Sequence, residues 1–135
     1  MFCLDTNAVI AVLNERTPDI AERLDAEIAR GATILLSTIV LYELRYGVAK
    51  SARPDRNEAV LETFLELPVT VVAFEAEDAA EAGGIRARLA RAGAPIGPYD
   101  VLIAAQARRR GAALVTSNRR EFERVHGLIV TDWAA

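Results

Sequence analysis

Short, almost continuously apolar stretches alternate along this chain with longer segments in which apolar residues recur every third or fourth position. Continuous apolar stretches are typical of strands buried on both faces, and the longer period is that of an amphipathic helix. The pattern predicts an α/β fold, in which helices flank both faces of a short parallel sheet of four or five strands. The expected strands cover residues 2–4, 32–36, 69–74, 113–116 and 128–131, and the expected helices cover 6–14, 18–31, 38–52, 55–67, 75–92, 99–110 and 119–125.

Proline residues mark the expected ends of several helices. Thr17 precedes Pro18, and this pair is typical of a helix cap followed by proline in the first turn. We expect Pro54 and Pro68 to end the helices before them, and residues 93–98 to form a rigid loop. Strand order does not follow from these signals. In such folds, however, ligands bind beyond the carboxyl ends of the strands, so polar residues at those positions are candidates for function.

Length and composition favour one globular domain. The chain has 135 residues, of which 52% are hydrophobic, and we expect a single domain over residues 1–135. No apolar run approaches the roughly 20 residues of a membrane span, and no export signal is evident at the start. Cys3 is the only cysteine and lies in an expected strand, which indicates a core position. Together these features favour a cytoplasmic protein.

The charge distribution carries more information than the net charge of −3. A negative total is unusual for a nucleic-acid-binding domain. Lys50 is the only lysine, so nearly all basic residues are arginines, which suit bidentate contacts with phosphate. For any single arginine cluster we favour a solvated helix face. The clusters are Arg86, Arg88 and Arg91; Arg108, Arg109 and Arg110; and Arg119, Arg120 and Arg124.

Three acidic residues lack an ordinary local explanation. Asp5 directly follows an apolar strand, and Asp100 shares its helix face with apolar neighbours. Glu43 has no basic residue three or four positions away on its expected helix. A carboxylate on an apolar face is costly unless an arginine, a helix N-terminus or a cation compensates its charge. Asn118 follows another expected strand and adds a neutral oxygen.

Each of these residues also has a purely structural interpretation. Asp5 could cap the first helix through the amide of Asn7 or Ala8, and Asn118 could cap the helix that follows it. Asp100 lies in the first turn of a helix, where the dipole favours a negative charge. Glu43 could pair with a distant arginine. The coincidence of several such acids at element starts or on apolar faces favours function.

The chemistry of these side chains predicts a hard-oxygen site. Carboxylates and an amide, without thiol or imidazole, suit Mg²⁺ or Mn²⁺ rather than Zn²⁺. His126 is the only histidine, so a mechanism that needs two histidines is excluded. No nucleophile-elbow motif supports a Ser-His-Asp triad, and the chain has no Gly-rich phosphate loop with a lysine.

Several segments match one known family in order and spacing. They are LDTN at 4–7, YELRYG at 42–47, PIGPYDVLIAAQA at 95–107, LVTSNRREFERVHGL at 114–128 and TDW at 131–133. On these segments the chain resembles the PIN-domain ribonucleases and, within them, the VapC-type toxins of bacterial toxin–antitoxin pairs. The resemblance runs from Phe2 to Trp133 and implies a PIN-like fold.

The resemblance also implies a catalytic set and a reaction. The family's acidic quartet falls on Asp5, Glu43, Asp100 and Asn118, of which the three acids would hold Mg²⁺ or Mn²⁺. Asparagine at the fourth position departs from an all-acid quartet and leaves one fewer negative charge. The expected activity is hydrolysis of RNA phosphodiester bonds by a metal-activated water, with transfer RNA as the expected substrate. Arg86, Arg119 and Arg120 are candidate phosphate contacts.

The same resemblance implies protein partners. We expect a homodimer and inhibition by a VapB-type antitoxin, with a larger assembly when the antitoxin is bound. The helices over 38–52 and 55–67 are our choice of partner surfaces, weighed against plain core packing. Tyr99 is considered as a platform for a stacked base, against the simpler interpretation of an aromatic residue in the core or at the rim.

Two other functions are alternatives to RNA cleavage. A phosphatase of the haloacid-dehalogenase type also begins with an aspartate after its first strand. Such a site has a second aspartate two residues later, where this chain has Asn7. The other rival is a non-catalytic PIN scaffold that binds RNA or protein, and the three intact acids argue against it.

Overall fold

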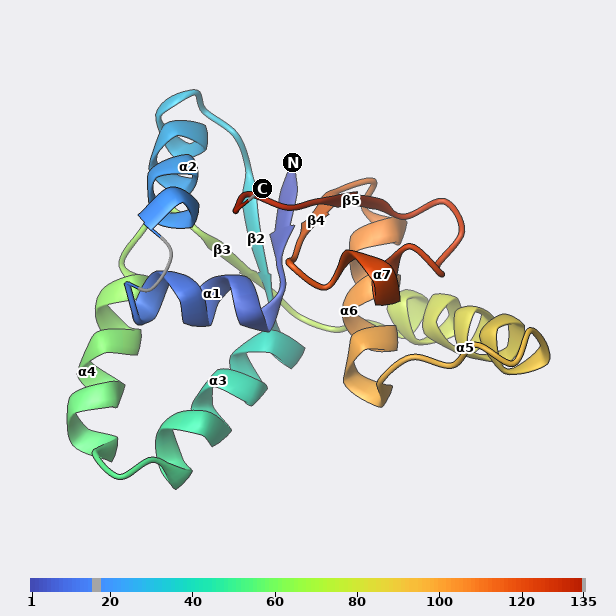
Figure 1. Cartoon of the computed structure of the whole chain (residues 1–135), viewed down its shortest axis with the longest axis horizontal. Coiled ribbons are helices and arrows are strands. Elements are labelled where there is room, and N and C mark those ends of the chain that lie inside the picture. Colours follow the sequence, from blue (N-terminus) through green and yellow to red (C-terminus); the bar gives the residue numbers. More distant parts are fainter. Residues whose placement is uncertain (16–17, 135) are drawn as a thin grey trace.

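A computed structural model describes residues 1–15 and 18–134 and contains a parallel five-stranded sheet (Figure 1). The strands are β1 (Phe2–Leu4), β2 (Ile34–Ser37), β3 (Thr70–Val72), β4 (Ala113–Val115) and β5 (Ile129–Thr131). The helices are α1 (Thr6–Leu13), α2 (Pro18–Ala29), α3 (Thr38–Lys50), α4 (Pro54–Leu65), α5 (Ala76–Arg91), α6 (Pro98–Arg109) and α7 (Arg119–Phe122).

The strand order β3-β2-β1-β4-β5 places β1 at the centre of the sheet. The chain moves outward from β1 to β3, then crosses back to β4 and continues to β5. Helices α1 to α4 lie on one side of the strands in Figure 1, and α5 to α7 lie on the other, as right-handed crossovers require. The direction of winding reverses between β1 and β4, so the carboxyl ends of these two strands form the crevice in which such sheets bind ligands.

Every expected strand and helix is present, with shifts at the ends that have local causes. Pro54 does not end a helix but begins α4, and Pro98 begins α6, because proline fits the first helical turn, where no amide donor is needed. Strand β3 covers only Thr70–Val72, and α7 is a single turn. Thr17, expected to cap α2, lies outside the described residues.

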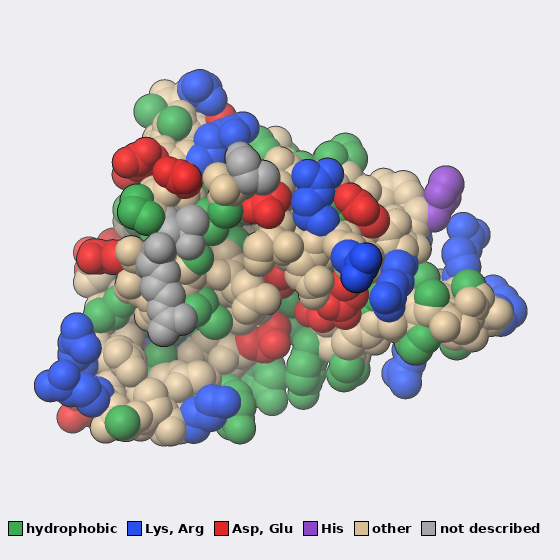
Figure 2. All heavy atoms as spheres, viewed as in Figure 1, with side chains coloured by type: hydrophobic (Ala, Val, Ile, Leu, Met, Phe, Trp, Pro, Cys, Tyr) green, Lys and Arg blue, Asp and Glu red, His purple; other side chains and the backbone are tan. Residues whose placement is uncertain are grey.

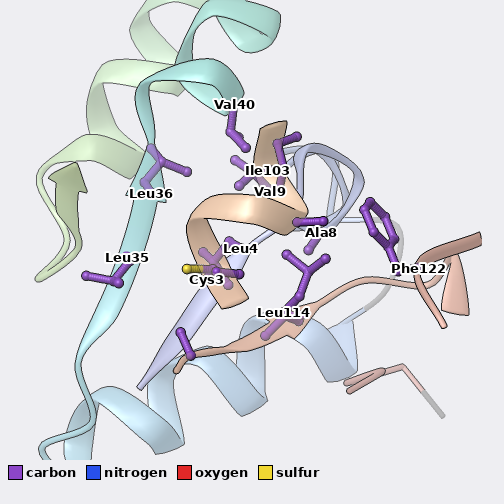
Figure 3. Packing of buried hydrophobic residues seen from close by; sticks show 14 of the residues in the cluster. Cys3, Leu4, Ala8, Val9, Leu35, Leu36, Val40, Ile103, Leu114 and Phe122 are labelled. Atoms are coloured by element: carbon purple, nitrogen blue, oxygen red, sulfur yellow. The ribbon is translucent and has the colours of Figure 1, made fainter. Parts of the chain in front are cut away.

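The core lies between the sheet and its two helical layers (Figure 3). All four residues of β2 are buried, as their continuous apolar pattern predicts for a strand beside the centre. Leu4 and Leu114 come from neighbouring strands, and Val9, Val40 and Ile103 from the helices around them. The Cys3 thiol is buried here, and burial raises its pKa to about 11, which keeps it protonated.

Buried polar residues fix α5 and α6 to each other. Asp78 is fully buried in the first turn of α5, and its Oδ1 accepts a hydrogen bond of 2.5 Å from Nε of Arg109 at the end of α6. Gln106 of α6 donates to the carbonyl of Ala73, just before α5. These contacts fix the C-terminal half of α6 against the start of α5. No helix of the described chain is long and apolar enough to cross a bilayer.

Candidate functional site

Asp5 occupies the crevice between the ends of β1 and β4. The strands pair with Leu4 opposite Val115, so the next residues, Asp5 and Thr116, come side by side. Oδ2 of Asp5 accepts a hydrogen bond of 2.8 Å from the Thr116 hydroxyl, and Oδ1 accepts one of 2.8 Å from the Thr6 amide. The capping interpretation of Asp5 is correct, but the bond comes from Thr6 rather than from Asn7 or Ala8. At 3% exposure, Asp5 is the most deeply buried of the four predicted site residues.

Glu43 comes to the same edge from α3. This half-buried carboxylate accepts a hydrogen bond of 2.7 Å from the Thr6 hydroxyl through its Oε1. Thr6 therefore joins two candidate acids, because its amide binds Asp5 and its hydroxyl binds Glu43. A distant arginine was the structural alternative for Glu43. The part of the chain that the structure describes contains no ion pair to this residue.

Asp100 lies in the first turn of α6 and is partly buried. The loop before it passes so close that a Cβ at Gly97 would lie 2.9 Å from Oδ2 of Asp100. Only glycine fits there without displacing the carboxylate, because real Cβ atoms do not approach an oxygen that closely. The Gly97 amide in turn donates a hydrogen bond of 2.8 Å to Oε1 of Glu121.

Glu121 is a fifth member of the group that the sequence reasoning missed. It lies in the single turn of α7, and its Oε2 accepts a hydrogen bond from the side-chain amide of Asn118. Asn118 is the N-cap residue of α7, as the structural interpretation expected, but its side chain makes no capping hydrogen bond. Its backbone amide donates to the Thr116 hydroxyl. The sequence did contain a signal for Glu121, because an acid three residues after a helix-cap residue is a known pattern at the start of helices.

The electrostatics of this group follow from burial and repulsion. Burial raises the pKa of Asp5, and hydrogen bonds from Thr116 and Thr6 only partly oppose this effect. Burial, the neighbouring Glu121 and repulsion from Asp5 and Glu43 raise the pKa of Asp100 to about 7. Glu121 behaves in the opposite way. Burial would raise its pKa, but hydrogen bonds from Gly97, Asp100 and Asn118 outweigh burial and lower it.

The donor set fits a hard divalent cation, whereas the present side-chain positions do not yet enclose one. All the candidate ligands are oxygens, and no arginine or lysine of the described chain forms an ion pair with Asp5, Glu43 or Asp100. Within residues 1–15 and 18–134, no three His, Cys, Asp or Glu side chains are arranged to hold a metal ion. Asp5 and Glu43 accept hydrogen bonds from Thr6 and Thr116, and these threonines hold both carboxylates at the same edge of the sheet.

The arginines and the tyrosine that were expected to contact RNA are exposed. Arg119 and Arg120 lie exposed on α7, and Figure 2 shows basic side chains beside acidic ones over this helix. Nε of Arg119 lies 3.3 Å from Oε1 of Glu123, so Arg119 forms an ion pair. Arg120 and Arg86, which are both exposed, form no ion pair in the described chain. Tyr99, expected in the core or at the rim, is 44% exposed, so the core alternative is wrong.

The chain is similar to a known protein family over nearly its whole length. Residues 2–128 match the PIN domain family. The tRNA(fMet)-specific endonuclease VapC of Shigella flexneri is 43% identical over 133 residues, which make up 98% of this chain and 98% of that protein.

Two solved structures extend the similarity to three dimensions. DNA-bound VapBC from Salmonella typhimurium contains a chain with a TM-score of 0.89 and 43% identity, covering 98% of this chain and 97% of its own. VapBC2 from Rickettsia felis, bound to a DNA fragment from its promoter, gives a TM-score of 0.92 at 36% identity, with 98% of both chains covered.

Proposed function

Since this chain belongs to the PIN-domain family and, within it, to the VapC ribonuclease toxins of toxin–antitoxin systems, we propose that it cuts RNA with a divalent ion held by Asp5, Glu43 and Asp100. The observation that carries this proposal is the convergence of residues from β1, α3, α6 and the β4–α7 turn at one edge of the sheet. Family membership also rules against the haloacid-dehalogenase alternative.

The proposed roles follow from the hydrogen bonds already described. Thr116 and Thr6 hold the two oxygens of Asp5 in fixed directions, and Thr6 orients Glu43. Asp100 approaches from the start of α6, where Gly97 leaves it room. Asn118 fixes Glu121 through Nδ2, and its carbonyl oxygen is proposed to accept a hydrogen bond from the attacking water.

The acids are proposed to act through Mg²⁺ or Mn²⁺. When bound, such an ion supplies a water of lowered pKa and positive charge toward the phosphate oxygens. The raised pKa values of Asp5 and Asp100 support this role, because both carboxylates need a positive charge to remain ionised together. Without that charge, four neighbouring acids would repel an RNA backbone. Arg86, Arg119 and Arg120 are proposed phosphate contacts around the acids.

Transfer RNA is the proposed substrate, and the initiator transfer RNA is its first candidate. The support is similarity to a relative that is named for cleavage of tRNA(fMet) and is 43% identical over nearly the full chain. The test compares the initiator with elongator transfer RNAs in parallel cleavage reactions. We expect one class to be cut at a single site, with a 5′-phosphate and a 3′-hydroxyl on the products.

A VapB-type antitoxin is the proposed protein partner, and α3 and α4 are proposed to form its binding surface. A hollow of about 640 Å³ lies against α1, α3 and α4, lined by Ile10, Leu44, Val60 and other residues. Its wall includes Glu43, so a chain segment that occupies it would reach the candidate site. We also propose a homodimer and a larger assembly with the antitoxin, which light scattering of the protein with and without antitoxin would test.

The deciding experiment is cleavage of RNA by the purified protein in Mg²⁺, in Mn²⁺ and in EDTA. We expect EDTA to abolish cleavage and Asp100→Asn to reduce it at least about 100-fold, since one metal ligand is lost. Asp25→Asn, an exposed aspartate on α2, is the matched control and should cut normally. Cleavage that survives in EDTA or in Asp100→Asn would contradict the proposal. Tight RNA binding without cleavage under any condition would favour the non-catalytic scaffold.

A further inference from the structure

Two exposed tyrosines stand directly beside two of the candidate acids. Tyr42 precedes Glu43 on α3, and Tyr99 precedes Asp100 on α6. Although distant in sequence, their ring centroids lie only 5.6 Å apart, with an angle of 53° between the ring planes. Figure 2 shows hydrophobic side chains gathered between α3 and α6, next to acidic ones. The packing that brings Glu43 and Asp100 to one edge of the sheet therefore also brings the two tyrosine rings together.

The rings are not used to fill the core. Tyr42 is 52% exposed and Tyr99 is 44% exposed, and both are among the most exposed large apolar side chains of the described chain. A base inserted between two rings needs a gap of about 7 Å, twice the 3.4 Å spacing of stacked bases. The separation of 5.6 Å is too small for that insertion. The surfaces available for stacking are therefore the outer faces of the pair.

We propose that Tyr42 and Tyr99 together form a platform on which one unpaired nucleobase of the RNA stacks, next to the phosphate that is cut. This inference rests on the proposed ribonuclease function and adds to it the residues that position the substrate. Stacking on an aromatic ring tolerates any base, because every base has a flat π surface. The platform therefore selects for unpaired nucleotides rather than for a sequence.

The position of the platform supports a base rather than another ligand. Adjacent Cα atoms are about 3.8 Å apart, so each ring is attached one residue from a candidate acid. A nucleotide whose phosphate faces the acids has its base within reach of these rings. In a duplex, neighbouring pairs cover both faces of a base, and the platform would be of no use. We therefore expect cleavage in a loop or another single-stranded segment.

The first measurement reads stacking without cleavage. A short single-stranded RNA carries 2-aminopurine, whose fluorescence falls on stacking, at each position around the cut site in turn. All proteins carry Asp5→Asn so that the RNA stays intact. We expect quenching at one position next to the scissile phosphate. Tyr42→Leu or Tyr99→Leu should remove this quenching, because leucine keeps apolar bulk without a ring, and Tyr42→Phe or Tyr99→Phe should retain it.

The second measurement is cleavage by the same tyrosine variants with Asp5 intact. Replacement of either tyrosine by leucine should lower kcat/KM by about 10- to 100-fold on single-stranded RNA. An abasic nucleotide at the quenched position should lower the kcat/KM of the wild type by a similar factor. In the leucine variants it should have little further effect on kcat/KM. The matched control is Tyr46→Leu, since Tyr46 lies one turn further along α3 and is 57% exposed. It should change neither measurement.

Each contrary result has a distinct meaning. If the wild type cuts no RNA in Mg²⁺, but 2-aminopurine at one position of the RNA is quenched and the leucine variants lose that quenching, the proposed function fails and base stacking on the tyrosines stands. If cleavage is normal in both leucine variants, or Tyr46→Leu impairs it equally, the platform is overturned. It is also overturned if light scattering shows that the leucine variants lose self-association while quenching persists, because the rings would then serve contacts between copies of the chain.

Discussion

The Thr116 hydroxyl donates a 2.8 Å hydrogen bond to Oδ2 of Asp5, which lies 111 positions earlier in the sequence. Both residues are buried and directly follow neighbouring strands. The same Thr116 oxygen accepts a hydrogen bond from the Asn118 amide, which sets the start of α7. One threonine thus orients the central carboxylate and fixes the turn that carries Asn118 and Glu121.

Replacement of Thr116 by valine tests this arrangement. Valine keeps the shape but removes the donor to Asp5, so a buried carboxylate loses one partner and its pKa should rise further. We expect a loss of stability of about 1–3 kcal/mol and a weaker affinity for Mn²⁺. Titration calorimetry and urea unfolding measure the two effects. Thr116→Ser restores the hydroxyl and should recover most of both; equal impairment by serine would contradict the role of the hydrogen bond.

The pair of Asp100 and Glu121 predicts a pH dependence of metal affinity. Protons compete with a metal ion for Asp100, whose pKa is raised to about 7, so apparent Mn²⁺ affinity should rise with pH and level off above neutrality. Glu121→Gln removes a negative charge beside Asp100, and the pH at which affinity levels off should fall by about one unit. Calorimetric titrations between pH 5.5 and 8.5 measure this midpoint. An unchanged midpoint would mean that Glu121 does not influence Asp100.

Asp100 should also make stability depend on pH when metal is removed with EDTA. The folded protein keeps the Asp100 proton up to about pH 7, whereas the unfolded chain loses it near the ordinary value of 3.8. The free energy of unfolding should therefore fall as pH rises between these values. At pH 8, Asp100→Asn should be more stable than the wild type by roughly 1–3 kcal/mol, with the difference vanishing near pH 4.

Urea unfolding in EDTA at pH 4, 6 and 8 measures that difference. Asp25→Asn, at an exposed position of α2, should change stability little at any of these pH values. A wild type and an Asp100→Asn variant with parallel pH curves would show that Asp100 ionises normally in the folded protein.

The ion pair between Asp78 and Arg109 should affect stability but not cleavage. Asp78 accepts hydrogen bonds from Arg109 and from the Glu75 amide, and burial opposes but does not outweigh their lowering of its pKa. Asp78→Asn should cost about 1–3 kcal/mol, since a charged hydrogen bond becomes a neutral one. Activity of the folded fraction should be unchanged, because Arg109 lies at the opposite end of α6 from Asp100. Glu77→Gln, exposed in the same helical turn, is the control.

The order of elements could be predicted from the sequence because each element carries its own periodicity. The strand order could not, since the short apolar runs around Leu4, Leu36 and Leu114 are equally suited to any buried position. Pro54 and Pro98 were harder to interpret. Proline excludes the interior of a helix, but it is equally compatible with the end of one helix and the first turn of the next.

Part of the candidate site could also be predicted from the sequence. Asp5, Glu43 and Asp100 stood out because no local partner explains their charge. Glu121 did not, because in the segment REFERV it has ordinary charged neighbours and resembles a solvated helix face. Its contact with Gly97 depends on how the loop before α6 packs against α7, which is a property of the tertiary fold.

The central position of β1, between β2 and β4, also determines at which stage of synthesis the candidate site can form. Asp5 and Glu43 leave the ribosome early, but Asp100 and the Thr116 donor belong to the last third of the chain. The crevice closes only after β4 has emerged and paired with β1. A partly translated chain therefore lacks one of the proposed metal ligands, and we expect RNA cleavage only from chains whose translation is nearly finished.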